Sequence, residues 1–305
     1  MAEQWCVKVP AGEGEKVRQA LLCEGALDTT LKVSREGAML LFPVTAPREG
    51  AVRCSFEPNP ARPDLPRHEL VGGIAIMQER DLPGARAVLA SRPSLQTVVV
   101  ANGEVKGEYR TREFEVLAGK PTTRTEVVEH GHRFIVDLSR AYFSARLSSE
   151  RQRILAQVGK GETVLDMFAG VGPFAITLAA KARLVVAADL NPMAVGLMIE
   201  NIGKNRSRNV LPALADARHL PLFFPRKFDR VVMNLPLSGT GFLESAFSLC
   251  RSGGMIHFYS LVSEESEHAA RIRELGGVVV AERVVRSYSP AQWHAVYDIL
   301  TMKNE

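Results

Sequence analysis

The sequence predicts an α/β protein in which two small α+β units precede a doubly wound, Rossmann-like sheet. In the segment 162–180, an apolar run ending at Asp166 leads into a turn with two glycines and then into apolar residues at helical spacing. The run 183–189 is a second β-rich stretch that ends at a carboxylate, so the two strands and the helix form a βαβ unit. Strand-like and helix-like segments then alternate up to a closing hairpin, which favours a sheet with helices on its faces.

A proline-rich segment separates the first domain from the rest. Residues 57–67 contain four prolines without hydrophobic periodicity, which is typical of a semi-rigid linker. We therefore place a small N-terminal domain at 1–60, a middle α+β domain at 68–130 and the third domain at 131–305.

Hydrophobic patterns predict the elements of each domain in turn. The N-terminal domain should contain a helix at 14–23 and strands at 4–10, 31–33 and 39–44. The middle domain should contain a helix at 83–90 and strands at 70–77, 97–101, 104–117 and 124–128. The third should begin with a strand at 133–137 and a helix at 148–155 that a serine caps. After the βαβ unit we expect a helix at 193–205, a strand near Val210, a strand at 228–233, a helix at 241–250 and strands at 255–261, 276–285 and 295–302.

Charge at the glycine turn indicates which nucleoside this sheet binds. Gly170, Gly172 and Ala175, with Asp189 downstream, formally satisfy the dinucleotide fingerprint of nicotinamide and flavin enzymes. A pyrophosphate, however, needs bare amides and a positive helix end, whereas Asp166 places a negative charge at the mouth of the turn. S-adenosylmethionine carries an ammonium and a sulfonium and no phosphate, so acids at successive strand ends, including Asp216, attract it. The pattern therefore favours a class I methyltransferase domain that uses S-adenosylmethionine.

The amino-acid composition limits the cellular compartment and the binding partners that we expect for this protein. The chain has 305 residues, of which 46% are hydrophobic, and its four cysteines form no CxxC pair. We therefore expect buried free thiols, no disulfide framework and no metal site. There is neither a signal sequence nor an apolar run of membrane-spanning length, so a cytoplasmic monomer without membrane contact is expected. The net charge of +4 is small, but basic residues gather between 203 and 230, where they either meet phosphates or complement a helix end.

Four motifs in order carry a family resemblance. They are Arg110-x-Arg112, the segment Tyr-Phe-Ser-Ala-Arg-Leu-Ser-Ser-Glu-Arg at 142–151, the glycine turn at 166–174 and Asn-Leu-Pro at 234–236. With them the chain resembles the archaeal and eukaryotic tRNA (guanine(37)-N(1))-methyltransferase family over essentially its whole length. The segment 142–151 makes the match specific. The resemblance implies an N-terminal domain that contacts the outer corner of tRNA, a middle domain and a methyltransferase domain.

The resemblance also implies the residues of the cofactor site. Together with Asp166, Gly170 and Gly172 of the turn, the predicted set is Tyr142, Arg146, Phe168, Asp189, Leu190, Asn191, Asp216, Asn234 and Pro236. Physical reasoning supports three of them. Asp189 at a strand end can accept both ribose hydroxyls, Asp216 can accept from the adenine amine, and Phe168 either covers an aromatic face or packs in the core.

Methylation at guanine N1 needs a base and a cation, because N1 is a lactam N–H and negative charge moves onto O6 when the proton leaves. By the resemblance, Glu150 is the base, Arg110 is the O6 partner and Asn234 orients the guanine. Arg112 can exchange roles with Arg110, since residues two apart on a strand share a face. The residues alone favour another interpretation of Glu150, as an exposed first-turn residue that complements the helix dipole.

Two departures from the family pattern leave alternatives open. Ala145 replaces a usual proline, and the loop 237–241 contains two glycines where bulkier residues are common. The alternative activity is methylation or aminocarboxypropyl transfer on a tricyclic wyosine-type guanine at the same tRNA position. Asn-Leu-Pro at 234–236 speaks against the aminocarboxypropyl reaction. A non-catalytic tRNA-binding module and a nicotinamide oxidoreductase are the alternatives from other classes.

Overall fold

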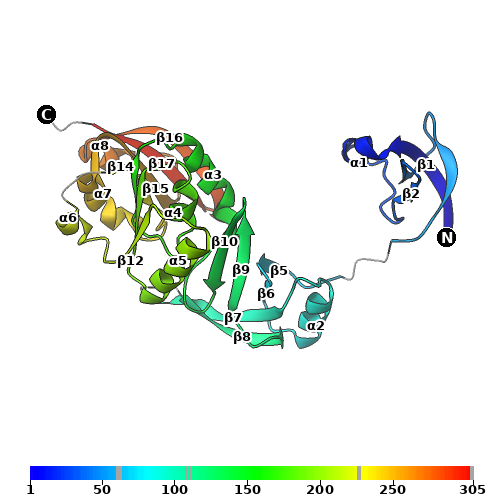
Figure 1. The fold of residues 1–305 in the computed structure, drawn as a ribbon, viewed down its shortest axis with the longest axis horizontal. Coiled ribbons are helices and arrows are strands. Elements are labelled where there is room, and N and C mark those ends of the chain that lie inside the picture. Colours follow the sequence, from blue (N-terminus) through cyan, green and yellow to red (C-terminus); the bar gives the residue numbers. More distant parts are fainter. Residues whose placement is uncertain (60–63, 107–108, 110, 225–227, 303–305) are drawn as a thin grey trace. The chain divides into compact units, whose positions relative to one another are not determined.

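The computed structural model describes residues 1–59, 64–106, 109, 111–224 and 228–302 (Figure 1). The chain divides into two compact units, Met1–Asp64 and Leu65–Glu305. None of the helices in the described ranges is long and apolar enough to cross a membrane.

The first unit is a four-stranded antiparallel sheet with one helix. In chain order it contains β1 (Ala2–Pro10), a short 3₁₀ turn, α1 (Gly14–Cys23), β2 (Ser34–Glu36), β3 (Met39–Val44) and β4 (Val52–Phe56). The strand order is β2-β3-β1-β4. Phe42 and Leu21 are buried in one cluster with the helix, while Phe56 belongs to a cluster around the cysteines. The expected strand at 31–33 is absent. Instead, Leu31 makes a single bridge to Pro58.

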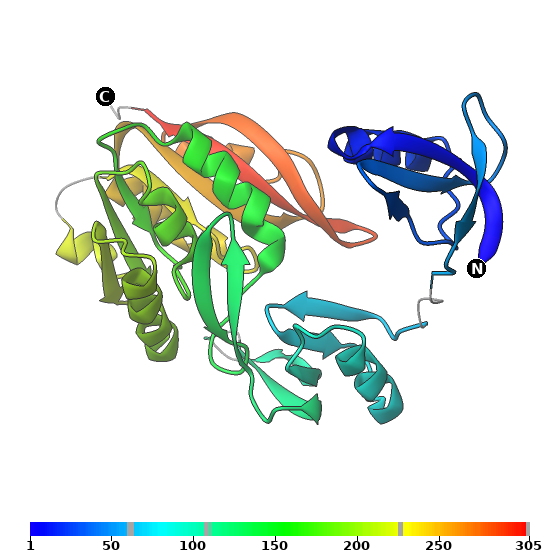
Figure 2. The same ribbon diagram turned by 45° about the vertical axis from the view of Figure 1, so that its right-hand side comes forward.

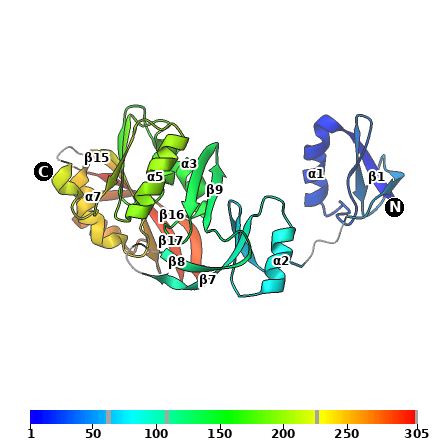
Figure 3. The same cartoon turned by 60° about the horizontal axis from the view of Figure 1, so that its bottom comes forward.

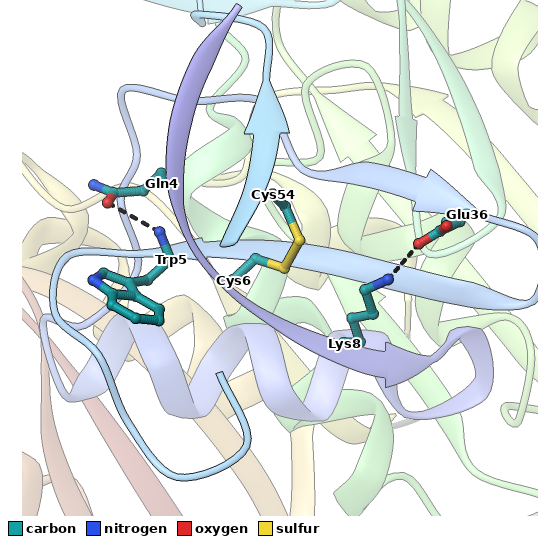
Figure 4. The surroundings of a disulfide bond; sticks show 6 residues. All are labelled: Gln4, Trp5, Cys6, Lys8, Glu36 and Cys54. Carbon is teal, nitrogen blue, oxygen red and sulfur yellow. Dashed lines mark hydrogen bonds and ion pairs between the residues drawn. A yellow bond between two sulfur atoms is a disulfide. The ribbon is translucent and has the colours of Figure 1, made fainter. Parts of the chain in front are cut away.

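A disulfide joins Cys6 and Cys54 in this unit, which corrects the expectation of free thiols (Figure 4). Cys6 lies on β1 and Cys54 on β4, and the two strands pair directly, which brings the Cα atoms to 6.0 Å. The sequence pattern had not predicted β4, so nothing indicated that these two residues would meet. Of the other cysteines, Cys23 is exposed and Cys250 is buried.

The second unit begins with a mixed sheet and a hairpin. The sheet has the order β5-β6-β7-β8, formed by β5 (His68–Val71), β6 (Ile74–Met77), β7 (Thr97–Lys106) and β8 (Thr111–Gly119). α2 (Leu82–Ala90) packs on it, and Asp81 caps this helix by accepting from Gly84 N at 3.0 Å. The hairpin consists of β9 (Arg124–Glu129) and β10 (His132–Asp137). β7 continues past the turn expected at 102–103.

A seven-stranded sheet forms the rest of the unit. Its strands are β11 (Thr163–Asp166), β12 (Leu184–Asp189), β13 (Val210–Leu214), β14 (Phe228–Met233), β15 (Cys250–Val262), β16 (Gly277–Ser289) and β17 (Gln292–Thr301). They lie in the order β13-β12-β11-β14-β15-β17-β16. The first five are parallel, and β17 runs antiparallel to both of its neighbours. β11 therefore lies between strands whose connections leave in opposite directions, which is where such sheets bind ligands.

Helices cover both faces of this sheet (Figure 2). One face carries α3 (Ser148–Gln157), α4 (Pro173–Leu178) and α5 (Pro192–Lys204). The other carries α6 (Leu220–Phe223), α7 (Leu243–Leu249) and α8 (Ala269–Glu274). The sequence did not predict α6 or α8. The expected serine cap of α3 is also wrong, because Leu147 occupies the cap position and makes no side-chain hydrogen bond.

The hairpin β9–β10 lies beside α5, and Asn201 joins them (Figure 3). Asn201 is fully buried and exchanges hydrogen bonds with the backbone of Ile135 at 2.6 and 3.0 Å. Its amide also donates to the carbonyl of Val171, in the glycine turn, at 3.0 Å. One hydrophobic cluster includes Val71, Phe134 and Ile176 and so joins the mixed sheet, the hairpin and α4. The separation into domains 68–130 and 131–305 stays a prediction.

Candidate active site

A cavity of about 390 Å³ opens at the carboxyl ends of β11, β12 and β14. Eight of the predicted cofactor residues line it: Tyr142, Phe168, Gly170, Asp189, Leu190, Asn191, Asp216 and Asn234. Residues from the loop before α3, from three strand ends and from the loop after β14 therefore converge there. Their roles toward a cofactor stay predictions.

The glycine turn requires glycine at both predicted positions. Gly170 has φ 56° and Gly172 has φ 87°, conformations that strain a side-chain-bearing residue. A Cβ on Gly172 would also lie 3.0 Å from Cγ of Met198 in α5. Gly172 is the cap residue of α4, and Pro173 follows in the first turn, where its missing N–H costs nothing. Gly172 does not line the cavity, so it shapes the turn from behind.

Asp189 fixes the turn and the start of α5. Its Oδ2 accepts from the backbone N–H of Gly170 at 2.7 Å, and its Oδ1 accepts from that of Asn191 at 2.9 Å. Burial raises the pKa of Asp189, and these amides partly offset the rise. Each oxygen keeps a free lone pair for a ligand hydroxyl. Asn191 uses its side chain to cap α5 and to bond to the carbonyl of Arg140.

Asp166 lies behind the cavity rather than in its lining. It is 1% exposed, and neither of its oxygens has a well-formed hydrogen bond among the described residues. Burial, and then the charge of Asp189, raise the pKa of Asp166 to about 7, although the nearby amides of Phe168 and Ala175 act against this. A buried carboxyl without a partner is costly, and a cation in the cavity would lower that cost.

Asp216 and Phe168 both line the cavity. Arg218 donates from Nε and Nη2 to the Asp216 carboxylate at 3.0 and 2.7 Å, and this bonding lowers the pKa of Asp216. Phe168 packs edge-on against Phe242, with ring centroids 5.1 Å apart. Phe168 thus both packs on the core and faces the cavity, so the two readings of this residue are compatible.

Arg146 and Pro236 do not line the cavity, contrary to expectation. Arg146 is exposed and pairs with Glu69 at 2.8 Å. It lines a second, open cavity of about 570 Å³ together with Arg67 and Arg112. Leu147, the cap residue of α3, and Arg151 of α3 line the first cavity instead.

The three residues predicted to act on the guanine have different positions. Asn234 follows β14 and lines the cavity. Glu150 is 9% exposed and does not line it, so the interpretation as an exposed first-turn residue is wrong. Its carboxylate bonds to Arg153 and Tyr259 because α3 packs over β15 and β17. Arg110 lies outside the described residues.

Several lining residues were not predicted. Arg151 is 1% exposed, and its guanidinium donates from Nε and Nη2 to Glu129 of β9 at 3.0 and 2.7 Å. It also lies over the rings of Phe143 and Phe174, each 5.7 Å away. The only sequence signal was proximity, since Phe143 and Arg151 belong to the segment 142–151. Ser238 lies in the loop 237–241, which the sequence marked only by its glycines, and no sequence pattern pointed to Phe242.

The walls of this cavity suit a cationic nucleoside. Carboxylates stand at two lining positions and one buried position, while aromatic rings supply apolar surface. Within the ranges that the structure describes, no group of three or more His, Cys, Asp or Glu residues could hold a metal ion.

Two family models match the chain. The TRM5/TYW2 methyltransferase domain matches residues 125–285, and the tRNA methyltransferase 5 N-terminal domain matches residues 6–52. The tRNA (guanine(37)-N(1))-methyltransferase Trm5b of Pyrococcus abyssi is 40% identical, and the alignment covers 96% of this chain and 97% of that protein. The tRNA 4-demethylwyosine(37)-methyltransferase Taw21 of Saccharolobus solfataricus is 33% identical, with 76% of this chain and 93% of that protein covered.

Solved structures agree with this assignment. The crystal structure of Trm5b from P. abyssi has a TM-score of 0.76 at 38% identity and covers 98% of this chain and 100% of that one. The complex of aTrm5 with tRNALeu has a TM-score of 0.72 at 29% identity and covers 97% of this chain and 99% of that one. The chain therefore belongs to the TRM5/TYW2 family of methyltransferases, with a Trm5-type N-terminal domain.

Proposed function

We propose that this protein transfers a methyl group from S-adenosylmethionine to N1 of guanine 37 in tRNA, the nucleotide 3′ to the anticodon. The observation that carries the proposal is the share of this chain that aligns with relatives of known activity. The two guanine N1 methyltransferases named Trm5b align with 96% of this chain, and residues 6–52 match the Trm5 N-terminal domain. The relatives that act on 4-demethylwyosine align with only 76% of it.

The cavity provides what S-adenosylmethionine needs, and when bound the cofactor supplies an electrophilic methyl group. Asp189 keeps lone pairs for the ribose hydroxyls while its backbone bonds hold it in place. Asp216 accepts from the adenine amine, and Phe168 covers an aromatic face. The buried carboxyl of Asp166 supplies negative charge behind the site, which favours a bound cation over a pyrophosphate.

The reaction needs the N1 proton to leave. We assign Glu150 as the base, Asn234 as the group that orients the guanine, and Arg110 or Arg112 as the cation that stabilises charge on O6. Asn234 lines the cavity, and Arg112 is an exposed residue of β8. For Glu150, the support is its motif and its buried, hydrogen-bonded carboxylate.

A guanine in the anticodon loop must leave its stack to enter the cavity, so tRNA has to be held at more than one place. Arg206 and Arg208 are exposed after α5 and can meet phosphates. Lys204 is less available to a phosphate, because its ammonium forms an ion pair with Glu126 at 2.6 Å. We assign contact with a distant part of the tRNA to the first unit.

The test is incubation of the protein with labelled S-adenosylmethionine and an unmodified tRNA transcript that carries G37, followed by mass analysis of nucleosides. 1-Methylguanosine from this transcript, and none from a matched transcript with A37, is the expected result. A tRNA that carries 4-demethylwyosine is assayed in parallel for added methyl and aminocarboxypropyl groups. Product from this tRNA alone would replace the proposed activity with the wyosine-type alternative.

A further inference from the structure

A row of charged side chains lies buried behind α3. Arg230 donates from Nε to Glu162 at 2.8 Å, and its Nη1 lies 2.7 Å from Nε2 of the fully buried His257. A guanidinium has no acceptor, so Nε2 of His257 accepts this bond and Nδ1 carries the proton. Nδ1 then donates to Asp298 at 2.7 Å. Burial lowers the pKa of His257 although Asp298 acts against this, so the imidazole is neutral.

The row ends at Glu150. Arg153 donates from Nη1 to Asp298 at 2.5 Å and from Nε to Oε2 of Glu150 at 2.9 Å. The same Oε2 accepts from the hydroxyl of Tyr259 at 3.1 Å. Among the residues that the structure describes, none donates a hydrogen bond to Oε1 of Glu150. One carboxylate oxygen is thus held by two donors, and the other has no donor within the described ranges.

The carboxylate of Glu150 lies close to the cavity wall, through its neighbours in the chain and through Tyr259. Leu147 and Arg151 lie three residues before and one after Glu150, are buried with it, and line the cavity. The ring of Tyr259 packs against that of Phe174 at 5.8 Å, and Phe174 also lines the cavity. Figure 2 shows α3, in green, lying over the long strands from which Tyr259 and Asp298 come.

We propose that Arg153 and Tyr259 are positioning residues that anchor Glu150 through Oε2 and leave Oε1 to take the proton from guanine N1. The inference rests on the proposed function, which gives Glu150 a proton to accept. The electron pair of the N–H bond stays on N1 and takes the methyl group, while the electrons of the broken carbon–sulfur bond stay on sulfur. Hydrogen bonds to a carboxylate favour its ionised form, which is the form that a base needs. Burial raises the pKa of Tyr259, so its hydroxyl remains a donor.

Tyr259→Phe in the full chain tests the anchor, because it deletes one hydroxyl and no packing surface. We expect the single-turnover rate of methyl transfer to fall about tenfold, as for the loss of a hydrogen bond to a charged group. The KM for tRNA and the Kd for S-adenosylmethionine should not change. The acid limb of the pH–rate profile should move to higher pH, since the carboxylate has lost a donor.

Tyr297→Phe is the matched control, because Tyr297 is equally buried on the neighbouring strand β17 and has no bond to Glu150. Its rate and pH profile should equal those of the unaltered protein. An unchanged or raised rate in Tyr259→Phe, or an equal loss in both variants, would overturn the inference.

Glu150→Gln separates this inference from the proposed function. If Glu150 is the base, its replacement lowers the rate by roughly 10²- to 10⁴-fold, and adding Tyr259→Phe to it has no further effect. If Tyr259→Phe lowers the rate of the Glu150→Gln variant by as much as it lowers the rate of the unaltered protein, Tyr259 does not act through Glu150. That result would overturn the positioning role and leave the base assignment in place. A normal rate in Glu150→Gln would remove the base assignment itself.

Discussion

Oδ2 of Asp189 accepts the backbone N–H of Gly170 at 2.7 Å, so the carboxylate at the end of β12 holds the turn that follows β11. Replacing Asp189 by Asn removes a charge and turns one acceptor into a donor that cannot bond to an N–H. We expect S-adenosylmethionine to bind about 10- to 100-fold more weakly, measured by calorimetry. Asp28→Asn in the first unit is the control and should bind normally.

The positive φ of Gly172 predicts a stability effect with an internal control. Gly172→Ala should lower the free energy of unfolding by about 1–3 kcal/mol, because of backbone strain and the close approach to Met198. Gly196 is exposed in the middle of α5, and a Cβ there would meet nothing within 4 Å. Gly196→Ala should therefore raise stability by about 0.5–1 kcal/mol. Urea unfolding measures the free energy of unfolding of both variants. A Gly172→Ala variant as stable as the unaltered protein would contradict the geometry of the turn.

The raised pKa of Asp166 predicts that cofactor affinity depends on pH. The folded protein without ligand holds a proton on this carboxyl below about pH 7, whereas a bound cation favours the ionised form. Affinity for S-adenosylmethionine should thus rise by up to about tenfold between pH 5.5 and 7, with release of a proton on binding. Calorimetry in buffers of different ionisation enthalpy measures that proton. The Asp166→Asn variant should bind S-adenosylmethionine more weakly, and its affinity should no longer depend on pH. If the affinity of this variant still depends on pH, another group causes the dependence.

Removal of the first unit should weaken the binding of tRNA and leave the binding of the cofactor unchanged. A fragment that starts at His68 keeps the second unit except for residues 65–67, none of which lines the site cavity, so we expect it to bind S-adenosylmethionine as the full chain does. It should methylate at high tRNA concentration but with a raised KM for tRNA, since a linked second contact raises the effective concentration. A fragment that no longer binds the cofactor would mean that the first unit is part of the catalytic core.

Local patterns predicted the centre of the fold well. The strand, turn and helix around Gly170 and Gly172 are set by residues within one βαβ unit, so the motif alone located them. Contacts between distant segments were not predictable in the same way. Glu150 is buried because Asp298 and Tyr259, more than 100 residues further along the chain, lie under α3.

The outward position of Arg146 illustrates the same limit. Its motif places it among the cofactor residues, but the turn before α3 directs it to Glu69 in β5. Helical spacing within one segment cannot show which of two neighbouring cavities a side chain enters. The pairing of Cys6 with Cys54 was hidden for a related reason, since it depends on a strand of only five residues, β4.

The three backbone bonds of Asn201 have a consequence for how this protein can be divided. One amide side chain ties α5 both to β10 and to the loop that carries Gly170 and Gly172. The hairpin that contains β10 also supplies Glu129, the partner of Arg151 in the cavity wall. A chimaera that exchanged catalytic domains at residue 131 would cut this hairpin at its tip and leave Arg151 without its counter-charge. A graft that keeps the site intact has to begin before Arg124, so the exchangeable module is larger than the sheet that performs the chemistry.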